Sequence, residues 1–263
     1  MPELGTRSPV AALAEALAGG SVEVLDLTAP LSERTPIIVL PPERGQAWKF
    51  QRTEISRYDE RGDHVFWNNF SMSEHAGTHF DAPVHWVSGR DRIDVSQVPP
   101  ADLVAPALVL DASDRVAADP EFLLQVADVE AWLAAHGPVT ERSWLLYRTG
   151  WDARVGDPAG FLNEGRTPGV HPDCAAWLAE QPWLIGFGVE TVGTDAGRAA
   201  EFSQPFPCHW HLHGAGKYGL TQLQNLSRLP VRGALLVVSP LPIVGGSGSP
   251  ARVYALLDGS VSE

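Results

Sequence analysis

The chain has 263 residues, 44% of them hydrophobic, which is enough apolar material for one packed domain spanning residues 1–263. Its formal net charge of −13 argues against nucleic acid and anionic membrane surfaces as partners, because both carry dense negative charge. No apolar run approaches the roughly 18 residues of a membrane span, and two cysteines are too few for a disulfide framework, so we expect a cytoplasmic protein with reduced thiols.

The first sixty residues predict one helix, one strand and a long loop. Residues 11–17 lie between Ser8-Pro9 and two glycines, a pattern typical of a short helix. Residues 22–28 predict a strand, which Pro30 ends. Residues 43–62 are polar and irregular and predict a loop, either the wall of a binding site or a segment that Trp48 anchors on the core.

Residues 73–86 carry three histidines and one aspartate at odd positions: His75, His79, Asp81 and His85. Alternate side chains of a strand share a face, so an extended stretch places all four on one side. In a helix, Asp81 would lie about 240° around the axis from His75. We therefore predict a strand with a polar, metal-binding face, the alternative being a strand with a solvated polar face.

Two imidazoles and a carboxylate are a common ligand set for Zn, Mn or Fe. Three protein ligands leave coordination positions open, which is typical of a catalytic centre rather than a structural one. His75, His79 and Asp81 are thus the predicted metal ligands.

The same residues resemble a known family. The run from His75 to His85 matches the H-x-G-T-H-x-D-x-P-x-H signature of the metal-dependent cyclase family, which includes bacterial kynurenine formamidases and isatin hydrolases. Residues 26–31, 146–150 and 221–226 resemble further family segments, so the resemblance covers about residues 25–257. It implies an α/β fold with a barrel-like β core flanked by helices.

The remainder of the chain predicts strands and helices in irregular alternation. The predicted strands cover residues 107–111, 144–150, 183–190, 235–240 and 253–257, and the predicted helices cover residues 126–136, with Asp128 as N-cap, and about 173–180. Arg148 is expected either to bind a carboxylate or to form a structural ion pair. Residues 245–250 predict a flexible loop.

His209, His211 and His213 alternate in a segment that we also expect to be extended, and Cys208 next to His209 would then face the opposite way. In the resembling family, the counterpart of His209 lies near the metal, and a glutamate twelve residues later completes a second metal site. This chain has Thr221 there, which lacks the charge of a carboxylate. We therefore expect one ion per chain and assign no role to His211 and His213.

The predicted function is a metal-dependent amidohydrolase acting on a small aromatic amide, in which one Mn²⁺ or Zn²⁺ activates a water molecule. His85 is expected to act as general base and then as general acid. The side chains predicted to bind substrate or support the ligands are Trp67, Trp86, His209 and Gln222. Loss of the glutamate favours an isatin-like cyclic amide over an arylformamide, and a non-hydrolytic metal-dependent cyclase is a further alternative. The resemblance also implies a homodimer or homotetramer.

Overall fold

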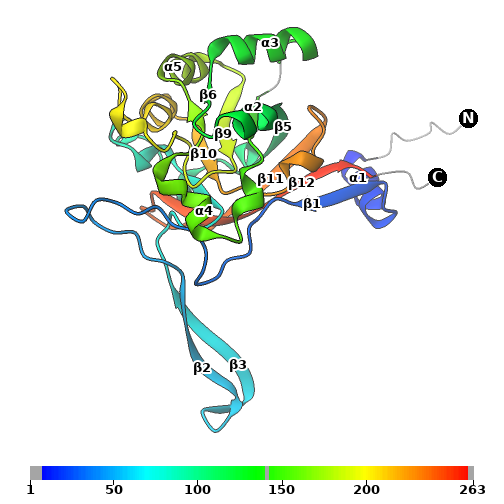
Figure 1. Ribbon diagram of the computed structural model, residues 1–263. Helices are drawn as coiled ribbons and strands as arrows, with labels where there is room; N and C mark the ends of the chain where they lie inside the picture. The colour runs from blue at the N-terminus through cyan, green and yellow to red at the C-terminus, as the bar shows by residue number, and fades with distance from the viewer. Residues whose placement is uncertain (1–7, 140–141, 260–263) are drawn as a thin grey trace, which may run out of the picture.

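The computed structural model describes residues 8–139 and 142–259, and Figure 1 shows its ribbon. Its strands are β1 (Val22–Asp26), β2 (Gln51–Asp59), β3 (Gly62–Ser71), β4 (His79–Asp81), β5 (Val104–Asp111), β6 (Leu123–Leu124), β7 (Ser143–Arg148), β8 (Gly169–Val170), β9 (Leu184–Val189), β10 (Tyr218–Thr221), β11 (Ala234–Pro240) and β12 (Gly248–Asp258). Its α-helices are α1 (Pro9–Ala18), α2 (Ser113–Ala118), α3 (Val126–His136), α4 (Pro158–Leu162) and α5 (Pro172–Glu180).

Eight strands form the central sheet in the order β1-β12-β11-β5-β7-β9-β10-β4. Because β4 pairs with β12 as well as with β10, every strand of this sheet except β1 belongs to a closed barrel. Strands β5, β7, β9 and β10 run parallel, whereas the pairings of β4, β11 and β12 are antiparallel. The predicted α/β fold with a barrel-like core is confirmed.

The parallel strands are buried on both faces, which explains why their sequences show no clear alternation. In β5, Ala107 and Val109 belong to the cluster that fills the barrel, whereas Leu108 and Leu110 belong to a second cluster under the helices. That outer cluster includes residues of α3 and α5, the two helices drawn above the sheet in Figure 1. Burial on two sides fixes the parallel strands, and the carboxyl end of β9 leads to Val192 and Gly193 of the site.

The predicted helices are found within one or two residues of the expected positions, but one predicted cap is wrong. Gln125 is the N-cap of α3. In a capping box, its side chain accepts a hydrogen bond from the backbone N–H of Asp128, and the Asp128 side chain accepts one from the backbone N–H of Gln125. Asp128 therefore lies inside the first turn, where its charge also favours the helix N-terminus. His171 caps α5 by accepting a hydrogen bond from the backbone N–H of Asp173.

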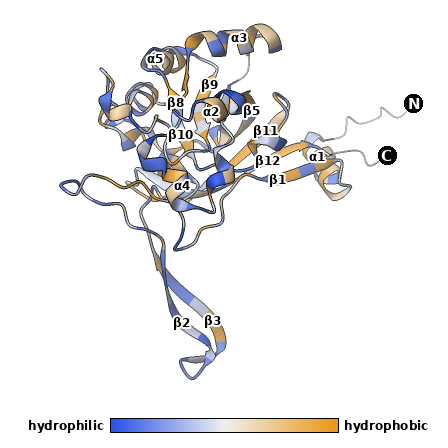
Figure 2. Ribbon diagram, in the orientation of Figure 1, coloured by the Kyte–Doolittle hydropathy of each residue, from blue (hydrophilic) through white to orange (hydrophobic). Residues whose placement is uncertain are grey.

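The predicted loop over residues 43–62 is wrong in its second half. Strands β2 and β3 pair only with each other and form a hairpin arm, residues 51–71, that projects away from the barrel (Figure 1). The arm mixes polar and apolar side chains along its length (Figure 2), and Tyr58, Phe66, Trp67 and Phe70 are exposed on it. Trp48, at the base of the arm, is exposed too and does not anchor the loop on the core.

Arg148 at the end of β7 forms an ion pair with Asp111 at the end of the neighbouring strand β5. Of the two roles expected for Arg148, the structure therefore shows the structural ion pair. No helix in the described part of the chain is long and apolar enough to cross a membrane. Both cysteines are free and buried, and burial raises the pKa of Cys174 to about 12, which leaves its thiol protonated and unreactive.

Gly186 in β9 lies against the ring of Trp144 in β7, and a Cβ atom at Gly186 would come within 2.3 Å of that ring. Because Trp144 is fully buried and cannot retreat, Gly186→Ala should lower the free energy of unfolding by about 2–3 kcal/mol in urea titrations. Gly156→Ala is the matched control, because a Cβ atom there meets open space. Equal stability of the two variants would contradict this packing.

Candidate metal centre

Strand β4 is much shorter than the sequence predicted. Only His79–Asp81 form a strand; residues 74–78 form a turn and bends, and Pro83–His85 form a 3₁₀ helix. Gly77 adopts a φ of +68°, a left-handed conformation that prevents β4 from extending back to His75. Pro83 starts the 3₁₀ helix that follows the strand. The prediction of one extended strand over residues 75–85 is therefore wrong, although β4 does place His79 and Asp81 on one face.

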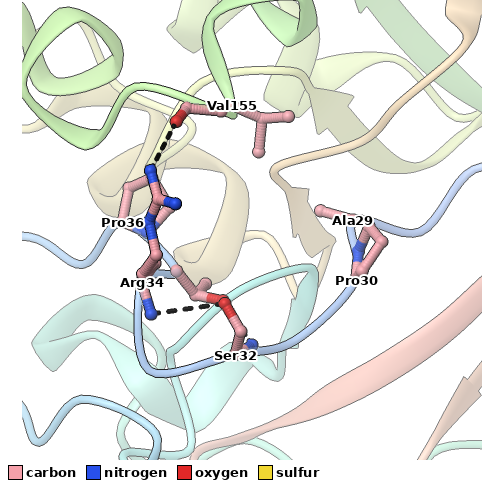
Figure 3. Close-up of a pocket in the computed structure, with 8 residues that line it drawn as sticks. Ala29, Pro30, Ser32, Arg34, Pro36 and Val155 are labelled. Carbon is pink, nitrogen blue, oxygen red and sulfur yellow. Dashed lines mark hydrogen bonds between the residues drawn. The ribbon is translucent and has the colours of Figure 1, made fainter.

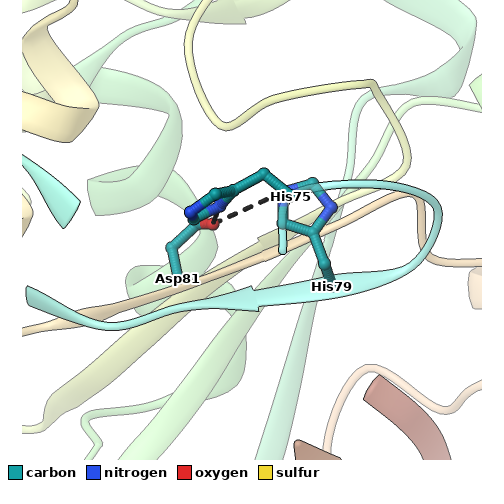
Figure 4. A group of neighbouring side chains, drawn as sticks. All are labelled: His75, His79 and Asp81. Carbon is teal, nitrogen blue, oxygen red and sulfur yellow. Dashed lines mark hydrogen bonds and ion pairs between the residues drawn. The ribbon is translucent and has the colours of Figure 1, made fainter. Parts of the chain in front are cut away.

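The turn before β4 nevertheless brings His75 back over the strand (Figure 4). Its Nδ1 lies 2.7 Å from Oδ1 of Asp81, and Nε2 of His79 lies 3.4 Å from the same oxygen. The three side chains offer ligand atoms within 4.8 Å of one another. Two imidazole nitrogens and a carboxylate oxygen converging in this way fit a divalent ion of the Zn or Mn type.

Asp81 is 1% exposed, so its charge must be compensated inside the protein. Burial alone would raise the pKa of Asp81, but the attraction of His79 and the hydrogen bond from His75 outweigh it and hold the pKa well below its usual range. The carboxylate is thus ionised and available to a cation.

His79 is held from behind by two oxygen atoms. Its Nδ1 lies 2.7 Å from the carbonyl oxygen of Gly77, and the Thr221 hydroxyl lies 2.8 Å from Nδ1 and 3.2 Å from Nε2. A carbonyl only accepts hydrogen bonds, so Nδ1 carries the proton and Nε2 faces Asp81. Thr221 thus contacts the ligand group directly.

His85 lies beside this group in the 3₁₀ helix. Its ring stacks on that of His75 with centroids 3.9 Å apart, and its centroid is 5.4 Å from that of His209. Burial lowers the pKa of His85 to about 2, and the neighbouring imidazoles add to this effect. The side chain is therefore a neutral imidazole over the physiological pH range.

The segment from Cys208 to Gly214 is helical, so the expected extended conformation is wrong. His209–His213 form one turn of π-helix, which places His209 and His213 on the same side. Together with Asp81 they form a second group with ligand atoms within 4.8 Å, whereas His211 is in neither group. Burial lowers the pKa of His213 to about 4, and its Nε2 is buried without a hydrogen-bond partner among the described residues.

Asp195 holds His209 in place. Its Oδ2 lies 2.5 Å from Nδ1 of His209, and its carboxylate also accepts hydrogen bonds from the backbone N–H groups of Cys208 and His209. Burial disfavours the charged ring, but the hydrogen bond and charge of Asp195 prevail and raise the pKa of His209.

A cavity of about 400 Å³ opens over the two groups. His75, His79, Asp81, His85 and His209 line its polar side, and Ile38, Leu40, Ala47, Trp86, Val192 and Phe206 line its apolar side. The rings of Trp86 and Phe206 meet edge to face at 5.4 Å. Residues 45–47 confirm that the loop before the arm forms a wall of this cavity.

Two residues predicted to bind substrate lie elsewhere. Trp67 is on the hairpin arm, 54% exposed, and is not among the residues that line the cavity. The side chain of Gln222 is completely buried, and its amide donates a hydrogen bond to the carbonyl oxygen of Pro36. Phe206, not Trp67, is the aromatic side chain that lines the cavity beside Trp86.

A separate hollow of about 260 Å³ lies between residues 29–36 and residues 155–156 (Figure 3). Arg34 is its charged side chain, and the guanidinium donates to the carbonyl oxygen of Gly156 across the hollow. This contact joins two loops, and the lining holds no carboxylate or histidine beside the Arg34 charge. The larger cavity is therefore the candidate functional site.

Sequence reasoning missed several residues of the site, namely Glu74, Asp195, Phe206, Ser247 and Gly248. Ser247 contacts both Glu74 and His75, and Asp195 holds His209. Glu74 precedes the first ligand directly, which was a signal that could have been used. Ser247 is 172 positions away from His75, so no local pattern indicates it.

The fold and the ligand group define an α/β barrel protein with a buried centre suited to a divalent ion. A family model described as putative cyclase matches residues 25–196, and the chain belongs to this cyclase family.

Relatives extend the match to nearly the whole chain. Isatin hydrolase of Roseibium aggregatum is 41% identical over 97% of this chain and 99% of its own length. A crystal structure of an isatin hydrolase bound to the product analogue thioisatinate superposes with a TM-score of 0.92, at 41% identity, over 96% of this chain and 100% of that one. Kynurenine formamidase of Geobacillus thermodenitrificans is 31% identical over 69% of this chain and 76% of its own length.

We predict that Asp81→Ala abolishes stoichiometric metal binding, because Asp81 is shared by both ligand groups. Metal content after loading with Mn²⁺ or Zn²⁺ and desalting measures the effect. Asp91→Ala is the control, because Asp91 is exposed and outside both groups. Unchanged metal content in a folded Asp81→Ala variant would show that Asp81 is not a ligand.

Proposed function

We propose that this protein is a metal-dependent amidohydrolase that opens a cyclic amide fused to an aromatic ring, as in isatin. The chain is a hydrolase of carbon–nitrogen bonds other than peptide bonds, as its near full-length match to an isatin hydrolase indicates. The observation that carries the proposal is the His75, His79 and Asp81 group at the floor of a cavity with an aromatic wall.

His75, His79 and Asp81 would hold one divalent ion per chain, Mn²⁺ or Zn²⁺. When bound, such an ion supplies Lewis-acid chemistry: it polarises a carbonyl group and lowers the pKa of water. The ligand group supports this role because the Asp81 carboxylate is ionised and buried, so that its charge is little screened.

His85 is the proposed general base. Its ring stacks on His75 and lines the cavity, and this position beside the ligand group supports the role. A neutral imidazole nitrogen accepts the proton of the attacking water, and the same nitrogen then returns the proton to the leaving amide nitrogen. Expulsion of that nitrogen as a neutral amine completes ring opening.

The apolar wall and His209 are proposed to orient the substrate. Trp86 and Phe206 offer ring faces and edges to a planar aromatic group. Asp195 accepts a hydrogen bond from Nδ1–H of His209, so Nε2 of His209 is the ring nitrogen that would bond the substrate. A cavity of about 400 Å³ matches a small bicyclic molecule better than a long one.

The match to kynurenine formamidase makes an arylformamide the alternative substrate. The two substrates differ in product, because ring opening yields one molecule and deformylation releases formate. A non-hydrolytic, metal-dependent cyclase is the remaining alternative, and it would bind the metal without consuming either amide.

The decisive assay follows isatin and an N-formyl aromatic amine with the metal-loaded protein. We expect isatin to be opened, and His85→Ala to lower kcat by about 10²–10⁴-fold with metal content nearly intact. His64→Ala is the control, because His64 is exposed on the hairpin arm. Formate release without isatin opening would favour the formamidase, and loss of metal from His85→Ala would make His85 a ligand.

We also propose a cytoplasmic homodimer or homotetramer. The buried free thiols of Cys174 and Cys208 suit a reducing compartment. The hairpin arm supports self-association, because an isolated two-stranded hairpin is only marginally stable and this one exposes 54% of Trp67 and 64% of Phe70. Packing the arm against another copy would cover these rings.

Replacing Trp67 and Phe70 together by serine should therefore shift the protein to a smaller species in light scattering coupled to size-exclusion chromatography. Replacing Asp63 and His64 by serine is the matched control, because these neighbouring residues on the arm are polar and exposed. An unchanged molar mass in the first variant would remove the arm from the interface.

A further inference from the structure

Ser247 links Glu74 to the ring of His75. The Ser247 hydroxyl lies 2.8 Å from Nε2 of His75 and 2.8 Å from Oε2 of Glu74. The backbone N–H of Ser247 donates to the same Glu74 oxygen at 2.9 Å. Three consecutive groups, a carboxylate, a hydroxyl and an imidazole, are thus connected behind the metal-facing side of His75.

The chemistry of these groups fixes the direction of the hydrogen bonds. The Glu74 carboxylate can only accept, so the Ser247 hydroxyl donates its single proton to Glu74. The Ser247 oxygen is then an acceptor for His75, and the proton of His75 is on Nε2. Nδ1 faces Oδ1 of Asp81 at 2.7 Å, and two lone pairs at that distance repel unless a cation, a proton or a metal ion, lies between them.

His79 shows the opposite arrangement. Its Nδ1 donates to the carbonyl oxygen of Gly77, which leaves Nε2 to face Asp81. The two histidines therefore present unlike nitrogen atoms to one carboxylate oxygen, and each is held through its other nitrogen.

The start of β12 also controls the position of the His75 ring. Gly248 pairs with Asp81 of β4, and a Cβ atom at Gly248 would come within 2.5 Å of Cε1 of His75. The backbone N–H of Ala82 donates to the carbonyl oxygen of Ser247, which fixes Ser247 against the end of β4. Ser247 is therefore held by backbone contacts that do not depend on its hydroxyl.

We infer that Glu74 and Ser247 are positioning residues that keep the proton of His75 on Nε2 and thereby make Nδ1 its metal-binding atom. The inference rests on the proposed metal site at His75, His79 and Asp81. Without the Ser247 hydroxyl, Nε2 of His75 loses its acceptor, the ring can exchange tautomers, and selecting the metal-binding tautomer then lowers the metal affinity.

Metal affinity and ring protonation test this directly. Metal-free wild type, Ser247→Ala, Ser247→Thr and Glu74→Gln are titrated with Zn²⁺ against a competing chelator. We expect Ser247→Ala to bind roughly 10- to 100-fold more weakly. Ser247→Thr retains the hydroxyl and should restore most of the affinity, and Glu74→Gln should fall in between. Ser249→Ala is the matched control, because its hydroxyl bonds the backbone of Leu241 and Pro250 rather than His75.

Histidine-ring ¹H–¹⁵N spectra of the Zn²⁺-loaded wild type give an independent result. They should show His75 protonated on Nε2 and metal-bound through Nδ1. His75 bound through Nε2, or equal Zn²⁺ affinity of folded Ser247→Ala and Ser249→Ala, overturns the inference. If Ser247→Ala does not fold, the wild-type spectrum alone decides. Failure of the wild type to bind Zn²⁺ through His75 at all instead refutes the proposed metal site.

Discussion

The structure depends on where the carboxylate of Asp81 can be placed. Its two backbone neighbours across the sheet are both glycines, Gly219 in β10 and Gly248 in β12. A Cβ atom at Gly219 would come within 2.7 Å of Oδ2 of Asp81, and one at Gly248 would collide with His75. Two absent side chains therefore make the room in which a buried negative charge and its imidazole partners meet. The same three strands close the barrel, so the pairings that close the sheet also position the side chains of the site.

Buried charge also explains how the surrounding histidines differ. Each ring is exposed to the same low dielectric, but only those bonded to an acceptor have a defined orientation. His79 and His213 donate to backbone carbonyls, and His209 donates to Asp195. His85 is held by stacking among other rings, and burial lowers its pKa to about 2, as burial also lowers the pKa of His213 to about 4. The histidines thus differ in orientation and protonation because each ring has a different hydrogen-bond or stacking partner.

Local patterns were sufficient for a mixed α/β class and for the chemical identity of the ligand group, whereas the barrel-like core was predicted from the resemblance to the cyclase family. Buried strands and amphipathic helices show in composition and periodicity, and α3 begins and ends at the predicted residues. The spacing of His75, His79 and Asp81 indicated the group correctly, but for a partly wrong reason, because a turn rather than a strand returns His75 to Asp81. Contacts such as that of Ser247 depend on pairing between distant strands, which residue spacing does not encode. The helical turn at His209–His213 was missed because its alternating histidines resemble a strand. The hairpin arm was missed because its polar sequence resembles a loop.

The order of the strands along the chain has a consequence for biosynthesis. β4 lies in the first third of the sequence, whereas its partner β12 follows every other strand. Until β12 has left the ribosome, β4 lacks one neighbour and His75 lacks Ser247 and Gly248 beside its ring. The nascent chain can bury the parallel strands and their helices early, but it cannot place Ser247 and Gly248 beside His75 before β12 has emerged. The surroundings of His75 are therefore completed by one of the last strand pairings that the described chain can make.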